Sequence, residues 1–345
     1  MRNARWGSVA VATNQEGYAH YTGINRCGNV WECPTCSHII RTKKAAEIEQ
    51  AVSVAESLGL GMLFVTRTIR HRAQDTLKKN LKVLAEARAC FGRHRRWRAI
   101  KKKYQITYNV KALEMTIGQN GWHTHDHDLF FCAVPLTEKD VIALRAEISD
   151  LWAECVVKVG GRAVSDEHGV DVQLVDHSGK VVGKYIAKMS MEVTSAGEKD
   201  AKNGNRTPWQ LLETDDAISI KLWREYVKAT KGKSAVRWSK GARDFFGPGR
   251  SLTDEELVAD DNDTTAEVPV KIEESVYREL IYGEDCIDTN VEILEEVERA
   301  VELSRRSGAP PDCSAVAQML GCVGEIVQCV NSDGEPQRWL WVHRA

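Results

Sequence analysis

The chain has 345 residues, 43% hydrophobic and 28% charged, a composition typical of a globular protein with one large domain or two ordinary ones. No stretch approaches the roughly 20 apolar residues that cross a bilayer. The first residues also lack the apolar core of a signal peptide, so the sequence predicts a cytoplasmic protein with no membrane partner. Residues 251–345 contain 22 acidic and 7 basic residues, against 27 and 40 in residues 1–250. A basic body with an acidic tail is typical of proteins that handle polyanions.

The first 40 residues form a cysteine-rich segment. Cys27, Cys33 and Cys36 have the spacing C-x5-C-x-x-C, and without a secretory signal such thiols are better explained as metal ligands than as disulfides. A structural zinc ion needs four ligands. His38 and His20 are the nearest candidates for the fourth, and the spacing does not decide between them, so His38 is the working assignment. A redox C-x-x-C is the rival, but a thioredoxin-like βαβ context is missing around it.

Apolar periodicity predicts the next elements in chain order. They are a helix over 42–58, a strand over 62–69, a helix over 75–98, strands over 105–117 and 122–134, a helix over 137–158, a strand over 170–175 and a helix over 179–192. The Gly-Gln-Asn-Gly stretch at 118–121 predicts a tight hairpin between the two adjacent strands. The order β-α-β-β-α-β predicts an α+β, ferredoxin-like (split βαβ) domain, an antiparallel sheet with helices on one face.

The remaining chain divides by composition. Residues 41–200 hold the main domain, and 201–250 form a helical extension rich in tryptophan and basic residues. Residues 251–272 are acidic and poor in apolar side chains, which predicts a linker. Residues 273–345 form a small C-terminal region of unknown role, with a helix over 289–305.

Three histidines follow the hairpin at two-residue spacing, and they predict a metal site. His123, His125 and His127 fall on one side of a strand, about 6–7 Å apart, because side chains alternate between the faces. In a tight hairpin Glu114 on the partner strand lies at their level. Two histidines and a carboxylate suit Mg²⁺ or Mn²⁺ with open positions for phosphate oxygens.

A further pair of residues predicts nucleophilic chemistry. Tyr185 and Lys188 are three residues apart on the helix over 179–192 and share a face. A tyrosine attacks a phosphodiester when a metal polarises the phosphate, and a nearby ammonium stabilises the charge that develops. A dense basic run predicts DNA contact, and Trp97 inside it is expected to stack on a base; the basic residues are Arg93, Arg95, Arg96, Arg98, Lys101, Lys102 and Lys103.

Together these motifs resemble the HUH endonucleases, in particular single-tyrosine plasmid rolling-circle replication initiators (Rep proteins) of the actinobacterial-like branch. The resemblance covers roughly residues 20–250 and includes the cysteine segment, the histidine strand, the Tyr-x-x-Lys helix, and the stretches Asn205–Trp209 and Trp238–Gly241. It implies that residues 41–200 are a metal-dependent DNA endonuclease and strand transferase that acts on origin DNA, with Arg206 in the DNA-binding extension.

The resemblance also implies roles. Tyr185 would attack one strand at the origin, leaving a 3′-OH for the host polymerase, with a host helicase as a further partner. His125 and His127 would be the paired ligands and His123 supplementary. Two departures remain: Asp126 stands where the family has a bulky apolar residue, and Val181 where some relatives place a glutamate for termination.

Two alternatives remain open at this point. A transposase or conjugative relaxase of the same superfamily keeps the fold, although relaxases commonly carry the tyrosine before the histidines. A zinc-ribbon DNA-binding regulator would use the cysteines and the basic run without catalysis. The oligomeric state is not predicted by the sequence.

Overall fold

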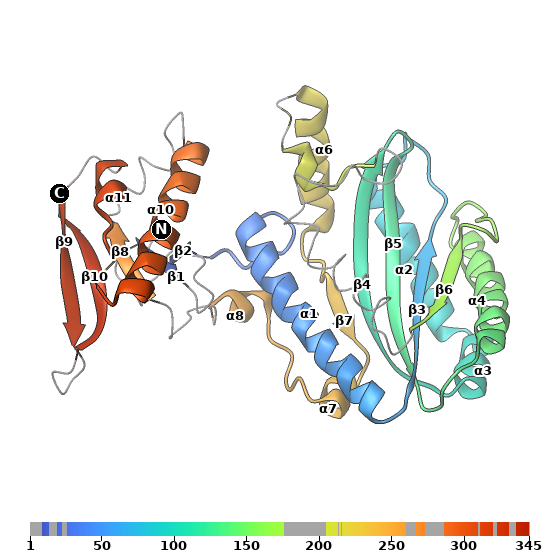
Figure 1. Ribbon diagram of the computed structural model, residues 1–345. Helices are drawn as coiled ribbons and strands as arrows, with labels where there is room; N and C mark the ends of the chain where they lie inside the picture. The colour runs from blue at the N-terminus through green and yellow to red at the C-terminus, as the bar shows by residue number, and fades with distance from the viewer. Residues whose placement is uncertain are drawn as a thin grey trace. The chain divides into compact units, whose positions relative to one another are not determined.

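The computed structural model describes residues 9–13, 19–22, 26–175, 205–212, 214, 216–259, 267–272, 286–309, 311–319, 323–330 and 336–344 (Figure 1). They divide into two compact units. One is Gly28–Val258, and the other combines Met1–Cys27 with Ala259–Ala345. Tyr185 and Lys188, with the predicted helix over 179–192, lie outside the described residues.

The unit Gly28–Val258 is built on a five-stranded sheet in the order β6-β3-β5-β4-β7, in which all neighbouring strands are antiparallel. The strands are β3 (Gly61–Thr68), β4 (Ile106–Gly118), β5 (Gly121–Cys132), β6 (Val170–Leu174) and β7 (Val236–Trp238). Helices α2 (Leu77–Arg93) and α3 (Arg95–Lys103) connect β3 to β4, and α4 (Glu138–Lys158) connects β5 to β6. The predicted order β-α-β-β-α-β is therefore confirmed.

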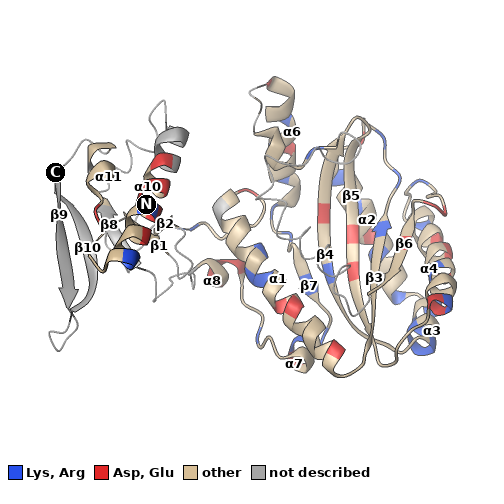
Figure 2. Cartoon of the chain, viewed as in Figure 1, with Lys and Arg blue, Asp and Glu red and all other residues tan. Residues whose placement is uncertain are grey.

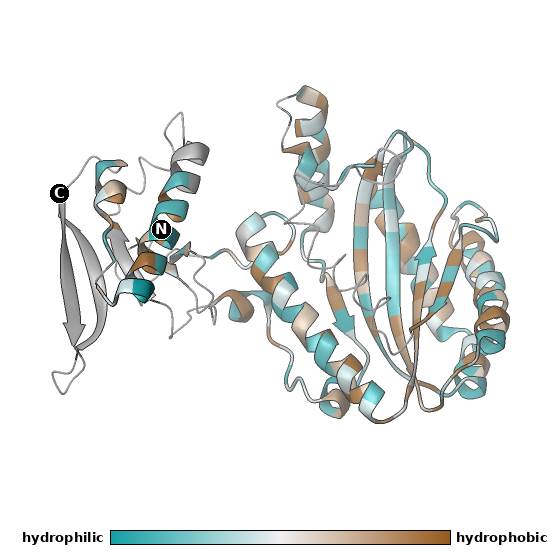
Figure 3. Ribbon diagram, in the orientation of Figure 1, coloured by the Kyte–Doolittle hydropathy of each residue, from teal (hydrophilic) through white to brown (hydrophobic). Residues whose placement is uncertain are grey.

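Helices cover both faces of this sheet, whereas the sequence predicted them on one. Leu63 and Phe130 pack against Trp152 of α4 in a core that also includes α2 and α3. Phe64 and Phe131 point the other way, into a core with α1 (Pro34–Ser57) and α7 (Ala242–Phe246) (Figure 1). The second layer forms because β3 and the end of β5 are apolar on both faces, and both faces must be buried (Figure 3).

The predicted hairpin between β4 and β5 is confirmed, and it fixes the register of the histidines. Gly118 pairs with Gly121, so residues 119 and 120 form the turn. Gly121 has φ +83°, and a Cβ there would lie 2.9 Å from Ala73 Cα, so only glycine fits. In this register Glu114 is directly opposite His125.

Two helix boundaries differ from the predictions. Helix α1 begins at Pro34 rather than near residue 42, because proline suits the first helical position and Cys33 caps the helix. The helix predicted over 75–98 is broken at His94, whose backbone is extended and whose Nδ1 accepts from the N–H of Arg96. The predicted start of α4 is confirmed, with Thr137 and Asp140 forming a capping box.

Residues 205–258 share the core of this unit instead of forming a separate extension. Tyr226 of α6 (Ala217–Thr230), Val236 of β7 and Phe246 of α7 are all buried in it. Helix α8 (Asp254–Ala259) lies inside the predicted linker and buries Leu257. Thr253 and Glu256 cap this helix reciprocally, a signal that was present in the sequence.

The second unit joins the two ends of the chain. Its sheet has the order β2-β1-β8-β10-β9, formed by β1 (Val9–Thr13), β2 (Ala19–Thr22), β8 (Glu267–Ile272), β9 (Val323–Val330) and β10 (Pro336–Arg344). Helix α10 (Cys286–Ser307) agrees with the helix predicted over 289–305, and α11 (Ser314–Met319) follows it. Because β1 pairs with β8, residues 1–40 are not one segment and 251–272 is not a plain linker. In the described part of the chain, no helix has the length and apolarity to span a membrane.

Candidate functional site

The three histidines of β5 form a row on the α1 face of the sheet. The ring centroids of His123 and His125 are 6.2 Å apart, and those of His125 and His127 are 6.1 Å apart. The ring planes are within 3° and 16° of parallel, respectively. His127 is buried, whereas His123 and His125 are half-buried and accessible to a ligand. The predicted one-sided row is therefore present.

Glu114 joins this row from β4. Its Oε2 accepts a hydrogen bond from His127 Nε2, so a carboxylate oxygen and an imidazole nitrogen share the space that a cation would take. The Glu114 side chain is 20% exposed, which leaves the pair open on one side. His125 is opposite Glu114 in the register, but its ring centroid is 6.1 Å from that of His127, and in the described residues these three side chains do not bring their donor atoms within 4.8 Å of one another. Two imidazoles and one carboxylate are residue types that bind divalent cations.

His127 is oriented by two neighbours on β3. Its Nδ1 lies 3.0 Å from the hydroxyl of Thr66, and its ring stacks on Phe64 at 5.3 Å between centroids. A hydroxyl both donates and accepts, so Thr66 can partner either tautomer of the ring. Partners of this kind fix the orientation of a metal-binding imidazole. The buried His127 therefore has its Nε2 aimed along the row.

His71 lies beside the row, a contact that no motif or periodicity in the sequence predicts. This loop residue lies between β3 and α2, and its Nε2 is 2.9 Å from His123 Nδ1. Its Nδ1 donates to the carbonyl of Asn120 in the hairpin turn, at 2.9 Å. A neutral His71 then accepts from His123 Nδ1–H, which leaves His123 Nε2 with a free lone pair. Burial lowers the pKa of both rings, and the electrostatic influence of His71 lowers that of His123 further. Both shifts favour the neutral imidazole, which is the form in which His123 can bind a metal ion.

The opposite face of β5 holds a buried charge network that accounts for Asp126. Asp126 and Asp128 are fully buried, and both accept from Arg67 of β3, which is 2% exposed. Arg88 of α2 donates to Asp126 at 2.9 Å. Burial alone would raise the pKa of Asp126, but the positive charges of Arg67 and Arg88 outweigh it and hold that pKa below its usual value. Asp126 is therefore an ion-pair anchor that holds the histidine strand to β3.

The described flanks of residues 176–204 lie on both sides of the histidine row. Before this segment, the N–H of Val175 donates to Met62 O at 3.0 Å. After it, Arg206 exchanges two backbone hydrogen bonds with Ile117, the β4 residue directly before the hairpin turn. Along β3, Met62 lies four residues from Thr66, the partner of His127 in the register. The described residues on either side of 176–204 are therefore bonded to β3 and β4, the two strands that flank β5.

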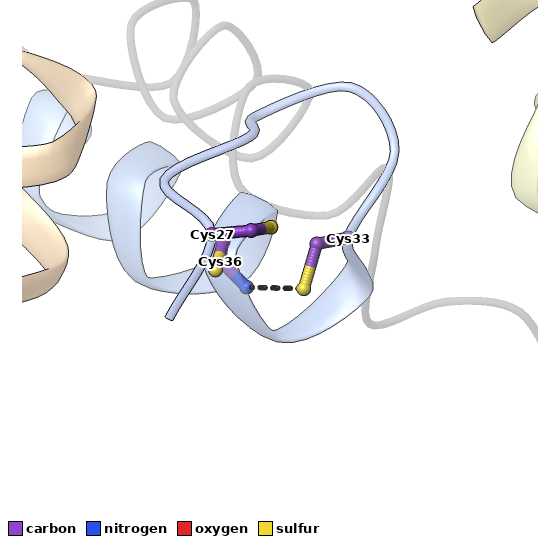
Figure 4. Close-up of side chains that lie close together, drawn as sticks. All are labelled: Cys27, Cys33 and Cys36. Atoms are coloured by element: carbon purple, nitrogen blue, oxygen red, sulfur yellow. Dashed lines mark hydrogen bonds between the residues drawn. The ribbon is translucent and has the colours of Figure 1, made fainter. Parts of the chain in front are cut away.

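The three cysteines of the predicted zinc site form a compact thiol cluster at the start of α1. The sulfur atoms of Cys27, Cys33 and Cys36 all lie within 4.8 Å of one another, and the N–H of Cys36 donates to Cys33 Sγ (Figure 4). Within the described residues this is the one such group of three or more metal-binding side chains. His38 is exposed on α1 and is not part of it, because residues two apart on a helix point to nearly opposite sides.

Zinc loading of these thiols is directly measurable. We expect purified protein to carry about one zinc ion per chain, and Cys33→Ser to carry close to none, because three thiolates supply most of the ligands of such a site. Elemental analysis gives the stoichiometry. Cys90→Ser, a half-buried thiol outside the cluster, is the matched control and should keep its zinc. Equal zinc content in the Cys33 and Cys90 variants would rule out a site at the cluster.

The predicted DNA-binding run is an exposed basic surface on α3, but Trp97 does not belong to it. Trp97 is 6% exposed and packs its ring against Phe91 and Phe130, so the expected stacking on a base is wrong. The basic residues of the run, which colour α3 blue in Figure 2, have exposed side chains, although Arg96 and Lys103 pair with carboxylates of α4. Arg206 is half-buried and donates to Ser219 Oγ at 3.4 Å.

Comparison with known proteins gives two relatives. The chain is 27% identical over 307 aligned residues to "Protein rep" from Streptomyces lividans, which covers 69% of this chain and 67% of that protein. It is 31% identical over 144 residues to "Neomycin resistance protein" from Streptomyces cyanogenus, which covers 34% of this chain and 33% of that protein. No family model matches the chain, and no solved structure matches it.

Proposed function

We propose that this protein initiates rolling-circle replication of a plasmid by nicking and rejoining one DNA strand, as a single-tyrosine HUH endonuclease with a ferredoxin-like nuclease domain. The observation that carries the proposal is the row of His123, His125 and His127 beside Glu114 on an antiparallel β-α-β-β-α-β sheet. The strand neighbours β6-β3-β5-β4 are those that a split βαβ arrangement requires. Similarity to a Streptomyces protein named for replication supports the same function.

His125, His127 and Glu114 would hold a Mg²⁺ or Mn²⁺ ion, with His123 as a supplementary ligand. The bound cation supplies electrophilic polarisation of the scissile phosphate. The protein fixes the ligand orientations through Thr66, Phe64 and His71. This arrangement leaves the half-buried side of the row for the phosphate oxygens.

Tyr185 is the proposed nucleophile, and the chain geometry allows it. It follows Val175 by ten residues, which span about 15 Å as a helix and up to about 33 Å when extended. The level of His127 lies four residues along β3 from the anchor of Val175, or about 13 Å. Both spans are at least as long as this distance, so the length of the chain permits the phenol of Tyr185 to reach the row.

In the proposed reaction the Tyr185 oxygen forms a bond to phosphorus as the bond from phosphorus to the 3′ oxygen breaks. The phenolic proton is lost to solvent and the leaving 3′ oxygen takes up a proton, so the products are a 3′-OH and a 5′-phosphotyrosine. Lys188, three residues after Tyr185 in the sequence, would stabilise the phenolate or the charge on the transferring phosphate. The reverse attack by a 3′-OH rejoins the strand.

The biological setting follows from this chemistry. Origin DNA is the substrate, a host helicase separates the strands, a host polymerase extends the 3′-OH, and the proposed location is the cytoplasm. The resistance name of the second relative belongs to that protein, which shares only a third of its length with this chain. A transposase or relaxase of the same superfamily remains distinguishable by substrate, because each would prefer its own DNA ends to a replication origin.

The thiol cluster and the exposed basic surface of α3 favour one second candidate, a non-catalytic zinc-dependent DNA-binding regulator. A supercoiled plasmid that carries the cognate origin separates the two. With Mg²⁺ or Mn²⁺ the initiator should relax the plasmid, and with EDTA it should not. Binding without relaxation under both conditions would favour the regulator.

The contact between His71 and His123 allows a sharper test of cation binding by the histidine row. We expect His71→Ala to weaken the cation affinity by about 10- to 100-fold, the usual cost of removing a partner that orients a metal-binding imidazole. The measurement is the Mn²⁺ concentration that gives half-maximal nicking. His168→Ala, an exposed histidine outside the row, should leave that concentration unchanged. A His71 variant with the same cation dependence as the His168 variant would exclude His123 as a ligand.

A further inference from the structure

A basic groove lies on the face of the sheet opposite the histidine row, between α2 and the paired strands β4 and β7. Two cavities of about 170 and 110 Å³ open along it, and Arg88 and Lys111 line both. Lys233 and Arg237 line the larger cavity, and Lys101 of α3 lines the smaller. Each cavity exceeds the roughly 30 Å³ that a water molecule occupies in the liquid.

The side chains that line the groove carry more positive than negative charges. Lys111 pairs directly with Arg237 in the register between β4 and β7, so two cations stand side by side on one face. Like charges at such positions repel each other. The positive charge of Lys111 acts on the buried Asp126 and Asp128, whereas neither Arg237 nor Lys233 forms an ion pair with a carboxylate of the described residues. The one acidic side chain in the lining, Asp128, is already bonded to Arg67 and Asn109.

The lining also identifies the type of anion. The larger cavity has aliphatic and cationic side chains and no aromatic ring on which a nucleobase would stack. Lys101 connects the groove to the exposed basic side chains of α3, among them Arg98 and Lys102. A track of cations longer than one small anion fits a phosphodiester backbone, which carries a charge at every nucleotide.

We propose that this groove binds backbone phosphates of the DNA, at a site separate from the nicking site and without reading the sequence. The proposal rests on the proposed function because its ligand is the DNA substrate. Arg88 also bonds Asp126, which alternates with the histidines along β5, so the groove and the row share one strand. The groove would hold the bound DNA while the opposite face of the sheet carries out the chemistry.

The test is the salt dependence of binding to a labelled oligonucleotide of arbitrary sequence, single-stranded and duplex, measured in EDTA so that nicking plays no part. Each phosphate contact that is lost lowers the slope of log Kd against log salt concentration by about 1. We expect Lys233→Gln with Arg237→Gln to lower the slope by about 2 and to weaken different sequences equally. Among the residues that the structure describes, Lys233 and Arg237 have no ion-pair partner, so the double variant should fold normally.

Lys139→Gln, which removes an exposed charge in the first turn of α4, is the matched control and should keep the parental slope. A double variant with the parental slope would overturn the proposal. Competition by inorganic phosphate at the same concentration as oligonucleotide phosphates would also overturn it, because it would assign the groove to a free anion. A lowered slope in a protein that never nicks DNA would leave the groove established and reject the proposed function instead.

Discussion

Replacement of His127 by alanine is expected to lower the rate of cation-dependent nicking by about 10²- to 10³-fold. His127 is the buried member of the row and the one that meets Glu114, so its loss removes a ligand and frees the carboxylate. Polarisation of a phosphate by a cation contributes several kcal/mol to the transition state, and each 1.36 kcal/mol changes the rate about tenfold. Single-turnover cleavage of an origin oligonucleotide in Mn²⁺ measures the effect.

Two controls separate chemistry from folding in this experiment. His168→Ala removes an exposed histidine and should cleave at the parental rate. Thermal unfolding of the His127 variant should show a loss of no more than about 2 kcal/mol, the cost of one buried hydrogen-bonding partner. A folded His127 variant that cleaves at the parental rate would exclude the row as the cation site.

Replacement of Arg67 by methionine is expected to lower the free energy of unfolding by about 3–5 kcal/mol. Arg67 is the shared partner of the buried Asp126 and Asp128, and its guanidinium lies over the rings of Phe91 and Trp152. Removing one member of a buried ion-pair network leaves charges without compensation in the interior. Urea denaturation followed by tryptophan fluorescence gives the free energy.

A variant that neutralises the fully buried part of the network is the matched control for this prediction. Arg67→Met combined with Asp126→Asn and Asp128→Asn removes all three fully buried charges and leaves only the partly exposed Arg88 without its carboxylate, so it should recover much of the stability that Arg67→Met alone loses. Equal stability of the single and triple variants would show that the loss comes from packing alone. An unchanged stability of the single variant would contradict the role of Arg67 as the anchor of β5.

The local pattern was sufficient to predict the histidine row. The Asn-Gly turn set the pairing of β4 with β5, and the pairing brought Glu114 opposite His125 as expected. Strand alternation then placed the three rings on one face. These features depend on residues within about 20 positions of one another, a range in which turn chemistry and periodicity determine the structure.

Features that depend on distant pairings were not predictable from one sequence. Asp126 looked like a departure from the HUH endonucleases that the sequence resembles, because its partner Arg67 is on another strand. His71 is in a loop without periodicity, and only the fold brings it to His123. The pairing of β1 with β8 joins residues more than 250 positions apart, which no local signal reveals.

Trp97 shows a different kind of error. The charged residues around it suggested an exposed base-stacking ring, but Trp97, Ile100 and Tyr104 recur at helical spacing and form the buried side of α3. The prediction for Trp97 followed the dense positive charge around it rather than this helical periodicity. The basic residues of the run remain exposed on the other side of the helix, where DNA contact is still the expectation.

Tyr185 is the proposed nucleophile for DNA strand transfer, and the histidine row is the proposed site of the cation that assists it. The most direct measurement is mass spectrometry of the protein after reaction with an origin oligonucleotide in Mn²⁺, with proteolysis and nuclease digestion before the peptides are mapped. The proposed function predicts a nucleotide joined through its 5′ phosphate to Tyr185, and no adduct in EDTA or in Tyr185→Phe. An adduct on another residue, or cleavage without any adduct, would contradict it.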